Sequence, residues 1–305
     1  MNPLVSFVMP AWNPQPDWLE NAVRHVLDQE GVDLELIVVD DGCAEPVAPL
    51  LDHVDDGRLR VVRVEHGGAC AARNAGIAES QGSYLRFVDA DDALERGSTA
   101  RLLTLNAGAD DVIAYGATLY CDQALRPVWT MRCRLQDDVR DDCLLGRFTV
   151  RPFSLLFPRA VVERTGAWDT RFRVSEDWDF ILRALEHATV RGETAVATAY
   201  RKHASAATTD MEAGERGAEL VLAKYFDRHP EQRGTRLERQ VRARLDAMMA
   251  RAQLTHGDAG GGWRSLRRSL RADPSAAARE VTQAAPALLG HARRRVSRLS
   301  RERPL

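Results

Sequence analysis

Phe87-Val88-Asp89-Ala90-Asp91-Asp92 is the stretch from which the organisation of this chain can be worked out. The apolar run from Tyr84 to Val88 is short and bulky, as in a buried strand, and it ends abruptly in three carboxylates. A strand interior would not hold these charges without compensation, so we expect the acidic side chains to lie at the mouth of a strand.

The three carboxylates allow two interpretations. Carboxylates this close repel one another, and a hard divalent cation whose other ligands are phosphate oxygens and water relieves the repulsion. That interpretation predicts a metal–diphosphate site. The alternative is a solvated Asp-rich turn that leads into a helix, with an aspartate as its N-cap. The six residues alone leave both interpretations open.

Strands and helices are expected to alternate on the N-terminal side of this stretch. Strands are predicted at Leu4–Met9, Leu34–Val39 and Leu59–Val64, and helices at Trp18–Gln29 and Val47–Val54. The strand runs are continuously apolar, which is typical of parallel strands covered on both faces. The order predicts an α/β fold with a Rossmann-like, mostly parallel sheet, flanked by helices and joined by right-handed crossovers.

The pattern is interrupted once on the C-terminal side. Residues 122–147 have mixed charge and poor periodicity, and we expect them to be irregular. The regular elements predicted around this segment are a helix at Glu95–Leu105, strands at Asp111–Tyr115, Phe153–Phe157 and Thr194–Tyr200, and helices at Pro158–Thr165 and Ser175–His187.

Beyond about residue 209 the sequence becomes helical. Helices are predicted at Ala213–Asp227, Arg236–Leu254, Trp263–Leu270 and Ser275–Leu289. We therefore expect three parts, which are an α/β domain at 1–209, a helical C-terminal region at 210–290 and a mobile Arg-rich tail at 291–305.

Composition narrows the class of protein. The 305 residues are 45% hydrophobic and carry a formal net charge of −2, which gives no electrostatic case for binding nucleic acid. The five cysteines are odd in number and show no CxxC pair or zinc spacing, so we expect reduced thiols. We see no signal segment and no apolar run of the roughly 18 residues that a transmembrane helix requires. A cytoplasmic location is predicted.

Positive charge is concentrated near the C-terminus. Eleven arginines lie from Arg264 to Arg303. They could hold the protein against the anionic inner face of a membrane, at about 1 kcal/mol for each residue. The alternative is a solubilising or disordered tail, and both interpretations stay open.

A glycine pair, Gly67-Gly68, opens a predicted helix that contains Arg73. Glycines permit close approach of the backbone, and the free N–H groups of a helix N-terminus favour an anion there. The pattern is not GxGxxG and does not follow the first strand, so it does not indicate a dinucleotide site. The alternative is a tightly packed helix start.

Two further groups of polar residues have structural and functional interpretations. Glu176 and Asp177 follow Ser175, a predicted N-cap, and acidic residues in a first turn also simply suit the helix dipole. His203 ends the predicted strand 194–200. A single histidine at a strand end is commonly a surface side chain, and it becomes a candidate ligand only if the sheet brings it to Asp91.

Six short motifs, taken in order, resemble those of family 2 glycosyltransferases, which are inverting enzymes with the GT-A fold. The resemblance covers about Leu4 to His203. The motifs are Pro10-Ala11-Trp12-Asn13, Val39-Asp40-Asp41-Gly42, Gly68 to Gly76 with Arg73-Asn74, Phe87 to Asp92, Gly166 to Asp169, and Glu176-Asp177.

The resemblance implies a site for a nucleotide-diphosphate sugar, most simply a UDP-sugar. The loops after the first two strands would hold the base and ribose, and a carboxylate there can accept the imide N–H of uracil. Arg73 would lie near the diphosphate. The residues that match on these loops are Pro10, Ala11, Asn13, Asp40 and Asp41. Cys43 stands where the family usually has serine.

The resemblance also implies a metal site and a base. Asp89, Ala90 and Asp91 match the family's DxD motif, in which the first acid faces the ribose and the second binds Mg²⁺ or Mn²⁺. His203 falls where many members place a further metal ligand. Asp177 is the candidate general base and Glu176 the runner-up.

The expected activity is metal-dependent transfer of a sugar, of the hexosyltransferase type. The acceptor hydroxyl of a glycan, a lipid-linked or a small-molecule acceptor would attack in a single displacement that inverts the anomeric configuration. The expected setting is glycan or cell-surface polysaccharide synthesis. The alternative is a non-catalytic protein that binds nucleotide sugars. A nucleotidyltransferase would carry a Gly-rich, basic loop after the first strand, and this sequence has none there.

Overall fold

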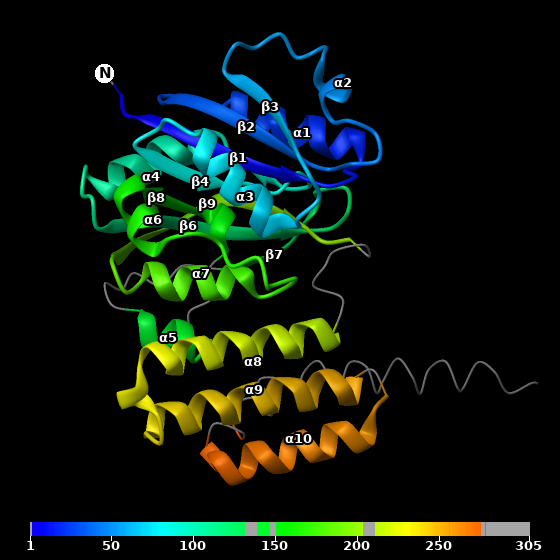
Figure 1. The fold of residues 1–305 in the computed structure, drawn as a ribbon, viewed down its shortest axis with the longest axis vertical. Coiled ribbons are helices and arrows are strands. Elements are labelled where there is room, and N and C mark those ends of the chain that lie inside the picture. The colour runs from blue at the N-terminus through cyan, green and yellow to red at the C-terminus, as the bar shows by residue number, and fades with distance from the viewer. Residues whose placement is uncertain are drawn as a thin grey trace, which may run out of the picture. The chain divides into compact units, whose positions relative to one another are not determined.

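The chain forms two compact units in a computed structural model, Met1–Gly217 and Ala218–Leu305. The structure describes residues 2–131, 139–146, 151–203, 211–255, 257–275 and 278. Figure 1 shows the sheet and its helices in the first unit and the helices of the second. The three-part division expected from the sequence stays a prediction.

Nine strands of the described chain form one mixed sheet. They are β1 (Leu4–Ala11), β2 (Asp33–Asp41), β3 (Leu59–Val64), β4 (Tyr84–Phe87), β5 (Ala93–Leu94), β6 (Val112–Cys121), β7 (Pro127–Met131), β8 (Leu155–Pro158) and β9 (Thr189–Arg201). Their order is β3-β2-β1-β4-β8-β6-β9-β5, and β7 pairs with β6. The first four are parallel neighbours, and β8 then joins β4 and β6 in antiparallel pairing.

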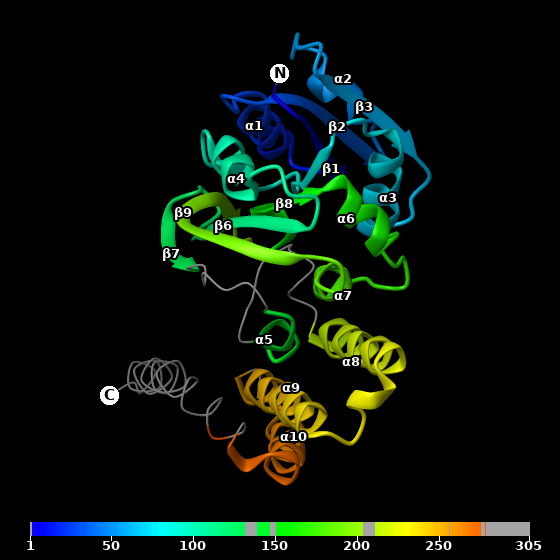
Figure 2. The same cartoon turned by 90° about the vertical axis from the view of Figure 1, so that its left-hand side faces the viewer.

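Helices cover both faces of this sheet. Helices α3 (Ala69–Glu79) and α6 (Arg159–Thr165) pack on one face, and α1 (Pro16–Leu27) and α4 (Ser98–Asn106) pack on the other (Figure 2). The remaining elements of this unit include α2 (Ala48–Leu51), α5 (Arg140–Leu144), the 3₁₀ turn η1 (Pro152–Ser154) and α7 (Glu176–Ala184). The predicted α/β architecture is confirmed.

Two expectations for the elements were wrong in detail. The segment expected to be irregular contains β7 and α5, because β7 pairs along β6 although its own sequence shows little periodicity. The helix expected from Glu95 begins at Ser98, because Ala93 and Leu94 form β5 against β9. In both cases pairing between strands determines the structure of a segment whose own pattern is weak.

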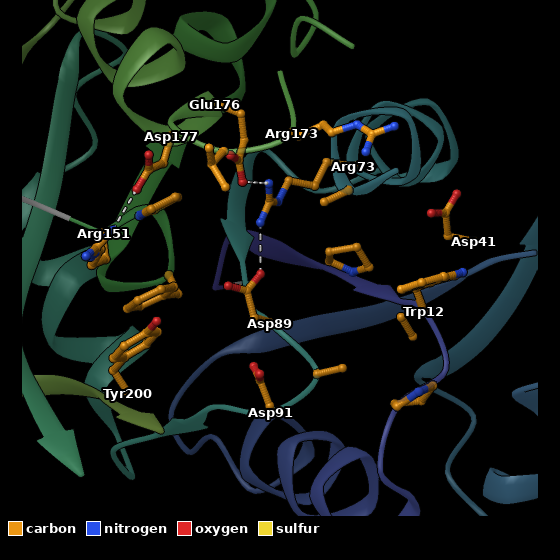
Figure 3. Close-up of a pocket in the computed structure, with 18 of the residues that line it drawn as sticks. Trp12, Asp41, Arg73, Asp89, Asp91, Arg151, Arg173, Glu176, Asp177 and Tyr200 are labelled. Carbon is orange, nitrogen blue, oxygen red and sulfur yellow. Dashed lines mark hydrogen bonds and ion pairs between the residues drawn. The ribbon is translucent and has the colours of Figure 1, made fainter. Parts of the chain in front are cut away.

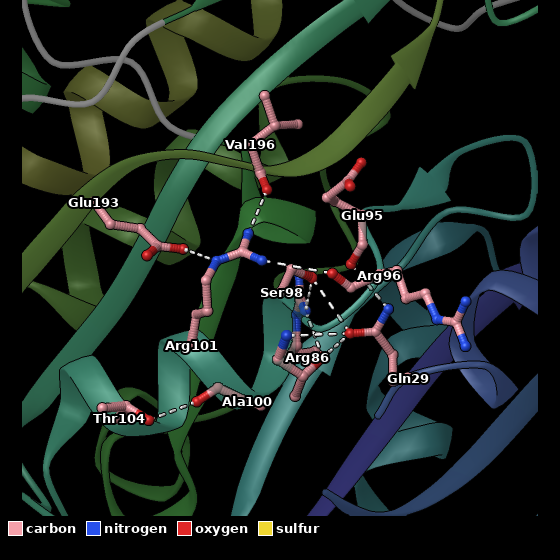
Figure 4. A network of polar contacts seen from close by, with 11 residues as sticks. Gln29, Arg86, Glu95, Arg96, Ser98, Ala100, Arg101, Thr104, Glu193 and Val196 are labelled. Carbon is pink, nitrogen blue, oxygen red and sulfur yellow. Dashed lines mark hydrogen bonds and ion pairs between the residues drawn. The ribbon is translucent and has the colours of Figure 1, made fainter. Parts of the chain in front are cut away.

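A buried arginine ties the centre of the sheet to the η1 turn. Arg86 on β4 is fully buried, and its guanidinium donates to Ser98 Oγ at 3.0 Å, Thr99 Oγ1 at 2.7 Å and the Phe153 carbonyl at 3.1 Å. Gln29 accepts from the hydroxyl and the N–H of Thr99, which extends the network to α1 (Figure 4). Burial, and to a smaller extent the charge of Arg101, lowers the pKa of Arg86 to about 9.

The second unit is helical where it is described. Helix α8 (Met211–Arg228) begins in the first unit, and α9 (Arg236–Thr255) and α10 (Ala259–Ala272) pack against each other. Asp258 caps α10 by accepting a hydrogen bond from Gly261 N at 2.8 Å, and Ser269 Oγ donates to the Ala243 carbonyl at 2.6 Å. Apart from Ser275 and Ala278, the helix predicted at 275–289 and the Arg-rich tail lie outside the described residues.

Two features of the described residues concern the location predicted from the sequence. No helix in the described part of the chain combines the length and the apolar composition needed to cross a bilayer. The four described cysteines, Cys43, Cys70, Cys121 and Cys143, are buried free thiols. The predicted cytoplasmic location stays a prediction.

Helix α3 lies unusually close to the sheet at Gly76. A Cβ atom added to Gly76 would lie 2.4 Å from Val8 Cγ1 and 3.2 Å from Val39 Cγ2. Both neighbours are buried, β-branched side chains that cannot easily rotate away. Gly76 therefore sets the height of α3 above β1 and β2.

Gly76→Ala is expected to lower the free energy of unfolding. The forced displacement should cost about 1–3 kcal/mol, partly offset by the gain of up to ~1 kcal/mol in helix propensity. Chemical denaturation measures the difference. Gly214→Ala in α8 is the matched control, because a Cβ there meets nothing within 4 Å and the gain in helix propensity is the same. Equal stability of the two variants would contradict the packing argument.

Candidate active site

A pocket of about 620 Å³ opens at the carboxyl ends of β1 and β4. Ligands of open α/β sheets commonly bind outside the carboxyl ends of the strands. The lining comes from the segments that follow β1 and β4, from η1 and the start of α7, and from the end of β2, helix α3 and the end of β9 (Figure 3). The lining residues used below are Pro10, Ala11, Trp12, Asn13, Trp18, Asp41, Arg73, Asp89, Ala90, Asp91, Arg151, Phe153, Arg173, Glu176, Asp177, Tyr200 and His203.

The acidic stretch after β4 forms a compact cluster. One carboxylate oxygen from each of Asp89, Asp91 and Asp92 lies within 4.8 Å of the others. Burial, followed by the charge of Asp89, raises the pKa of Asp91. Burial and the charges of Asp91 and Asp89 raise the pKa of Asp92 well above its usual range. The carboxylates therefore oppose one another's ionisation unless positive charge is brought to them.

This cluster fits a divalent cation. Asp92 Oδ1 accepts a hydrogen bond from Arg201 N at 2.9 Å, whereas its buried Oδ2 has no hydrogen-bond partner among the described residues. An unsatisfied carboxylate oxygen beside two further carboxylates is the hard-oxygen donor set that Mg²⁺ and Mn²⁺ prefer. The structure thus adds Asp92 to the residues that could hold the metal.

His203 lies beside the cluster. Its Nε2 is 2.7 Å from Asp91 Oδ2, and its ring packs against Trp18 with centroids 4.9 Å apart. The pairing of β9 with β5, which begins two residues after Asp91, brings the two side chains together. The sheet therefore brings His203 to Asp91, which was the condition for counting His203 as a candidate ligand. Its role in metal binding stays a prediction.

Arg73 connects this cluster to the start of α7. Its buried guanidinium donates to Asp89 Oδ1 at 2.9 Å and to Glu176 Oε1 at 3.1 Å. It also lies over the Trp168 ring, 4.7 Å from the centroid. Burial opposes its charge, but Asp89 and Glu176 outweigh burial and raise the pKa of Arg73. Arg73 is therefore a fixed cation between two carboxylates that are 87 residues apart, from Asp89 to Glu176.

The next residue on α3 fixes the turn before α7. Asn74 donates its amide to the Trp168 carbonyl at 2.9 Å and accepts from Trp168 N at 2.8 Å. Trp168 in turn stacks on Phe180, with ring centroids 4.0 Å apart. These contacts explain in physical terms why the Arg73-Asn74 and Gly166–Asp169 motifs occur together.

Glu176 and Asp177 open α7, as predicted, but have different partners. Burial raises the pKa of Glu176, with Arg73 opposing and Asp177 assisting the shift. Asp177 Oδ2 accepts from Arg151 Nη1 at 3.1 Å, and its Oδ1 accepts from Trp178 N at 2.8 Å. Ser175 occupies the N-cap position with φ of 68°, yet in this described segment its side chain makes no capping hydrogen bond. The backbone turn, not a serine cap, presents the two acids.

The two aspartates at the end of β2 point in different directions. Asp41 lines the pocket and accepts from the N–H groups of Gly67 at 2.8 Å and Gly68 at 3.0 Å. The anion expected at this glycine pair is therefore supplied in the structure by a carboxylate of the chain itself. His66 Nδ1 lies 2.9 Å from Asp41 Oδ2, and the His66 ring stacks on Trp12.

Asp40 is not among the lining residues. Its buried carboxylate accepts from Cys43 N at 2.8 Å, Val47 N at 3.0 Å and Arg63 Nη1 at 2.8 Å. Burial opposes its ionisation, but these partners outweigh it and lower the pKa of Asp40. In this structure Asp40 closes the loop after β2, and its predicted contact with a nucleotide stays a prediction.

The loop after β1 lies where the motifs predicted it. Pro10, Ala11 and Asn13 line the pocket, and Asn13 adopts φ of 43°. Its Oδ1 accepts from Ala44 N at 3.0 Å, and its N–H donates to Cys43 Sγ at 3.1 Å. Cys43 thus takes part in joining the two loops. Nucleotide binding by Pro10, Ala11, Asn13, Asp41, Arg73, Asp89, Ala90 and Asp91 stays a prediction.

Some pocket residues were not predicted from the sequence. Arg151, which pairs with Asp177, stands just after a segment without periodicity, and β8 brings it to the site. Arg173, Phe153 and Tyr200 also line the pocket. Arg173 lies three residues before the Glu176-Asp177 motif, and that proximity could have identified it as a candidate pocket residue. Arg151 has no motif near it in the sequence.

The solved structures that resemble this chain share its fold. S. aureus TarS 1-349 matches with a TM-score of 0.60 at 15% identity, over 90% of this chain and 81% of that chain. The same protein in complex with UDP-GlcNAc matches with a TM-score of 0.59 at 13% identity, over 89% and 91%. The likeness confirms the expected GT-A fold.

Curated relatives align with about 60% of the chain. "Uncharacterized glycosyltransferase EpsJ" of Bacillus subtilis is 28% identical over 200 residues, which are 62% of this chain and 58% of EpsJ. "Putative colanic acid biosynthesis glycosyl transferase WcaA" of Escherichia coli is 29% identical over 201 residues, 60% of this chain and 67% of WcaA. The match to "Uncharacterized protein y4gI" of Sinorhizobium fredii spans only 20% of that protein.

The family model "Glycosyl transferase family 2" matches residues 6–205, a range that holds every residue assigned to the pocket above. On that match, the chain belongs to glycosyl transferase family 2.

Proposed function

We propose that this chain is an inverting, metal-dependent hexosyltransferase that moves a sugar from a UDP-sugar to an acceptor hydroxyl. One observation carries the proposal. Two pairs of carboxylates, Asp89 with Asp91 and Glu176 with Asp177, line one pocket, and the buried Arg73 pairs with one member of each. A displacement at an anomeric carbon needs charge neutralisation at the leaving group and a base at the incoming group.

The charge of the pocket supports a bound cation. Five carboxylates line it, from Asp41, Asp89, Asp91, Glu176 and Asp177, against three arginines, Arg73, Arg151 and Arg173. The carboxylates of the pocket outnumber its arginines, so a bound diphosphate would increase the excess of negative charge there. Asp91, Asp89 and His203, with Asp92 beside them, would hold Mg²⁺ or Mn²⁺, and the bound ion would supply the neutralisation that the leaving diphosphate requires.

The residues on the other side of the pocket support proton transfer. Asp177 would take the proton from the acceptor hydroxyl while that oxygen forms its bond to the anomeric carbon. The bond from the anomeric carbon to the diphosphate oxygen breaks, and its electron pair leaves with the nucleotide. Arg151 would fix the orientation of the Asp177 carboxylate. A single displacement of this kind inverts the anomeric configuration.

The names of related proteins support the choice of donor and pathway. The TarS structures were determined with UDP-GlcNAc and with UDP. WcaA and "Putative teichuronic acid biosynthesis glycosyltransferase TuaG" are named for surface polysaccharides. We extend to this chain a UDP-sugar donor and a glycan, lipid-linked or small-molecule acceptor in polysaccharide synthesis.

Asp91→Asn should abolish the cation-dependent part of donor binding. Wild-type protein should gain thermal stability when UDP and Mn²⁺ are added together, because ligands that bind only the folded state raise the melting temperature. The Asp91→Asn variant should lose that gain, while its melting temperature without ligands should stay at the value of the wild type. Asp55→Asn, an exposed aspartate outside the pocket, is the control. Full activity of the wild type in excess chelator would refute metal dependence.

Asp177→Asn should reduce turnover and leave donor binding nearly unchanged. The substitution keeps the shape and removes the basicity, and losing a general base typically lowers kcat roughly 10²- to 10⁴-fold. The measurement pairs kcat for acceptor-dependent UDP release with the Kd for the UDP-sugar. Glu176→Gln is the comparison. Near-normal transfer by Asp177→Asn, together with no transfer by Glu176→Gln, would make Glu176 the general base instead of Asp177. A wild-type protein that binds the donor but never releases UDP would favour the non-catalytic alternative.

A further inference from the structure

Four aromatic rings run from the wall of the pocket to the hairpin of β6 and β7. Phe153 and Tyr200, both lining residues, stack with centroids 5.3 Å apart. Tyr200 meets Tyr120 edge-on at 5.2 Å, and Tyr120 stacks on Trp129 at 4.0 Å with an interplanar angle of 7°. We call these four residues the aromatic row.

The outer end of the aromatic row is open to solvent. Tyr120 and Phe153 are buried, whereas Trp129 is 46% exposed. Trp129 and Tyr120 are a cross-strand pair of β6 and β7, so one face of the indole is covered by Tyr120. An indole held flat by a buried tyrosine is pre-organised for a ligand, because little side-chain freedom remains to be lost on binding.

The inner end of the aromatic row meets the proposed base. The Arg151 guanidinium lies 5.8 Å from the Tyr200 ring centroid and donates through Nε to the Tyr120 hydroxyl at 3.4 Å. The same guanidinium donates to Asp177 at 3.1 Å. Figure 3 shows Asp177, Arg151 and Tyr200 together on the side of the pocket opposite Trp12 and Asp41. The row therefore approaches the pocket from the side on which an acceptor must enter.

We propose that the aromatic row is an acceptor subsite, in which the open face of Trp129 and the pocket-lining Tyr200 contact the pyranose rings of a glycan, while the buried Tyr120 and Phe153 hold these two rings in place. The proposal rests on the proposed function, in which Asp177 deprotonates an acceptor hydroxyl. One face of a pyranose carries mainly C–H groups, and aromatic faces bury such a surface well. The hydroxyls at the ring edge meet polar groups along the row, since Lys202 Nζ lies 5.2 Å from the Tyr120 ring and Arg151 lies beside Tyr200.

The test compares three variants of β7 in the full chain. Trp129→Ala removes the open ring, Trp129→Phe keeps an aromatic face, and Val128→Ala is the matched control. Val128 is 63% exposed, lies at the register shift between the Tyr120–Trp129 and Cys121–Pro127 pairs, and contributes no ring to the aromatic row. The probe is an array of pyranose oligosaccharides, read with UDP and Mn²⁺ present.

Wild type, Val128→Ala and Trp129→Phe should bind the same oligosaccharides, and Trp129→Ala should bind them at least about tenfold more weakly. The melting-temperature gain from UDP and Mn²⁺ should be equal in all four proteins, which separates loss of the subsite from loss of folding or donor binding.

Three outcomes would overturn the proposal. These are unchanged glycan binding by Trp129→Ala, the absence of any pyranose binding by the wild type, and a change in sedimentation mass on Trp129→Ala, which would assign the indole to contact between copies of this chain. The melting-temperature measurement with UDP and Mn²⁺ tests the proposed function separately. UDP and Mn²⁺ can stabilise the wild type whether or not it binds oligosaccharides.

Discussion

The ion pairs of Arg73 with Asp89 and Glu176 are the interaction on which the site depends. A guanidinium buried in a protein is unfavourable unless it is paired and hydrogen-bonded, and here the two partners come from opposite sides of the pocket. Without Arg73, the acids after β4 and those at the start of α7 would repel one another across the cavity. The Arg73 guanidinium thus allows two acidic groups, to which we assign different chemical tasks, to line the same pocket.

The sequence allowed part of this site to be predicted, because some of its polar residues end apolar strands. The predicted strand Leu59–Val64 matches β3 residue for residue, and Asp89 and Asp91, which follow β4, lie in the pocket. Asp177, which begins a helix and was predicted from the family resemblance, lies there too. What could not be predicted depends on pairing across the sheet. β8 inserts antiparallel between β4 and β6 and carries η1 with it, so the partnership of Arg151 with Asp177 has no local signal.

Asp40 illustrates a second limit of motif reasoning. Two adjacent carboxylates after a strand look equivalent in a sequence, but neighbouring side chains leave a strand on opposite faces. Asp41 therefore turns to the glycine pair and the pocket, while Asp40 turns inward to Cys43, Val47 and Arg63. A motif identifies which residues gather near a site, and only the fold assigns each one its contacts.

The contact of Gly76 with Val8 has a consequence for engineering this enzyme family. Because α3 rests directly on the sheet, the helix cannot be raised without moving Arg73, which lies on the same helix. Libraries that aim at a new donor preference should therefore keep α3 fixed and vary the loop around Trp12, where the indole is 59% exposed and borders the pocket without supporting the sheet. In such libraries α3 keeps Arg73 in place, so differences between variants can be attributed to the loop around Trp12.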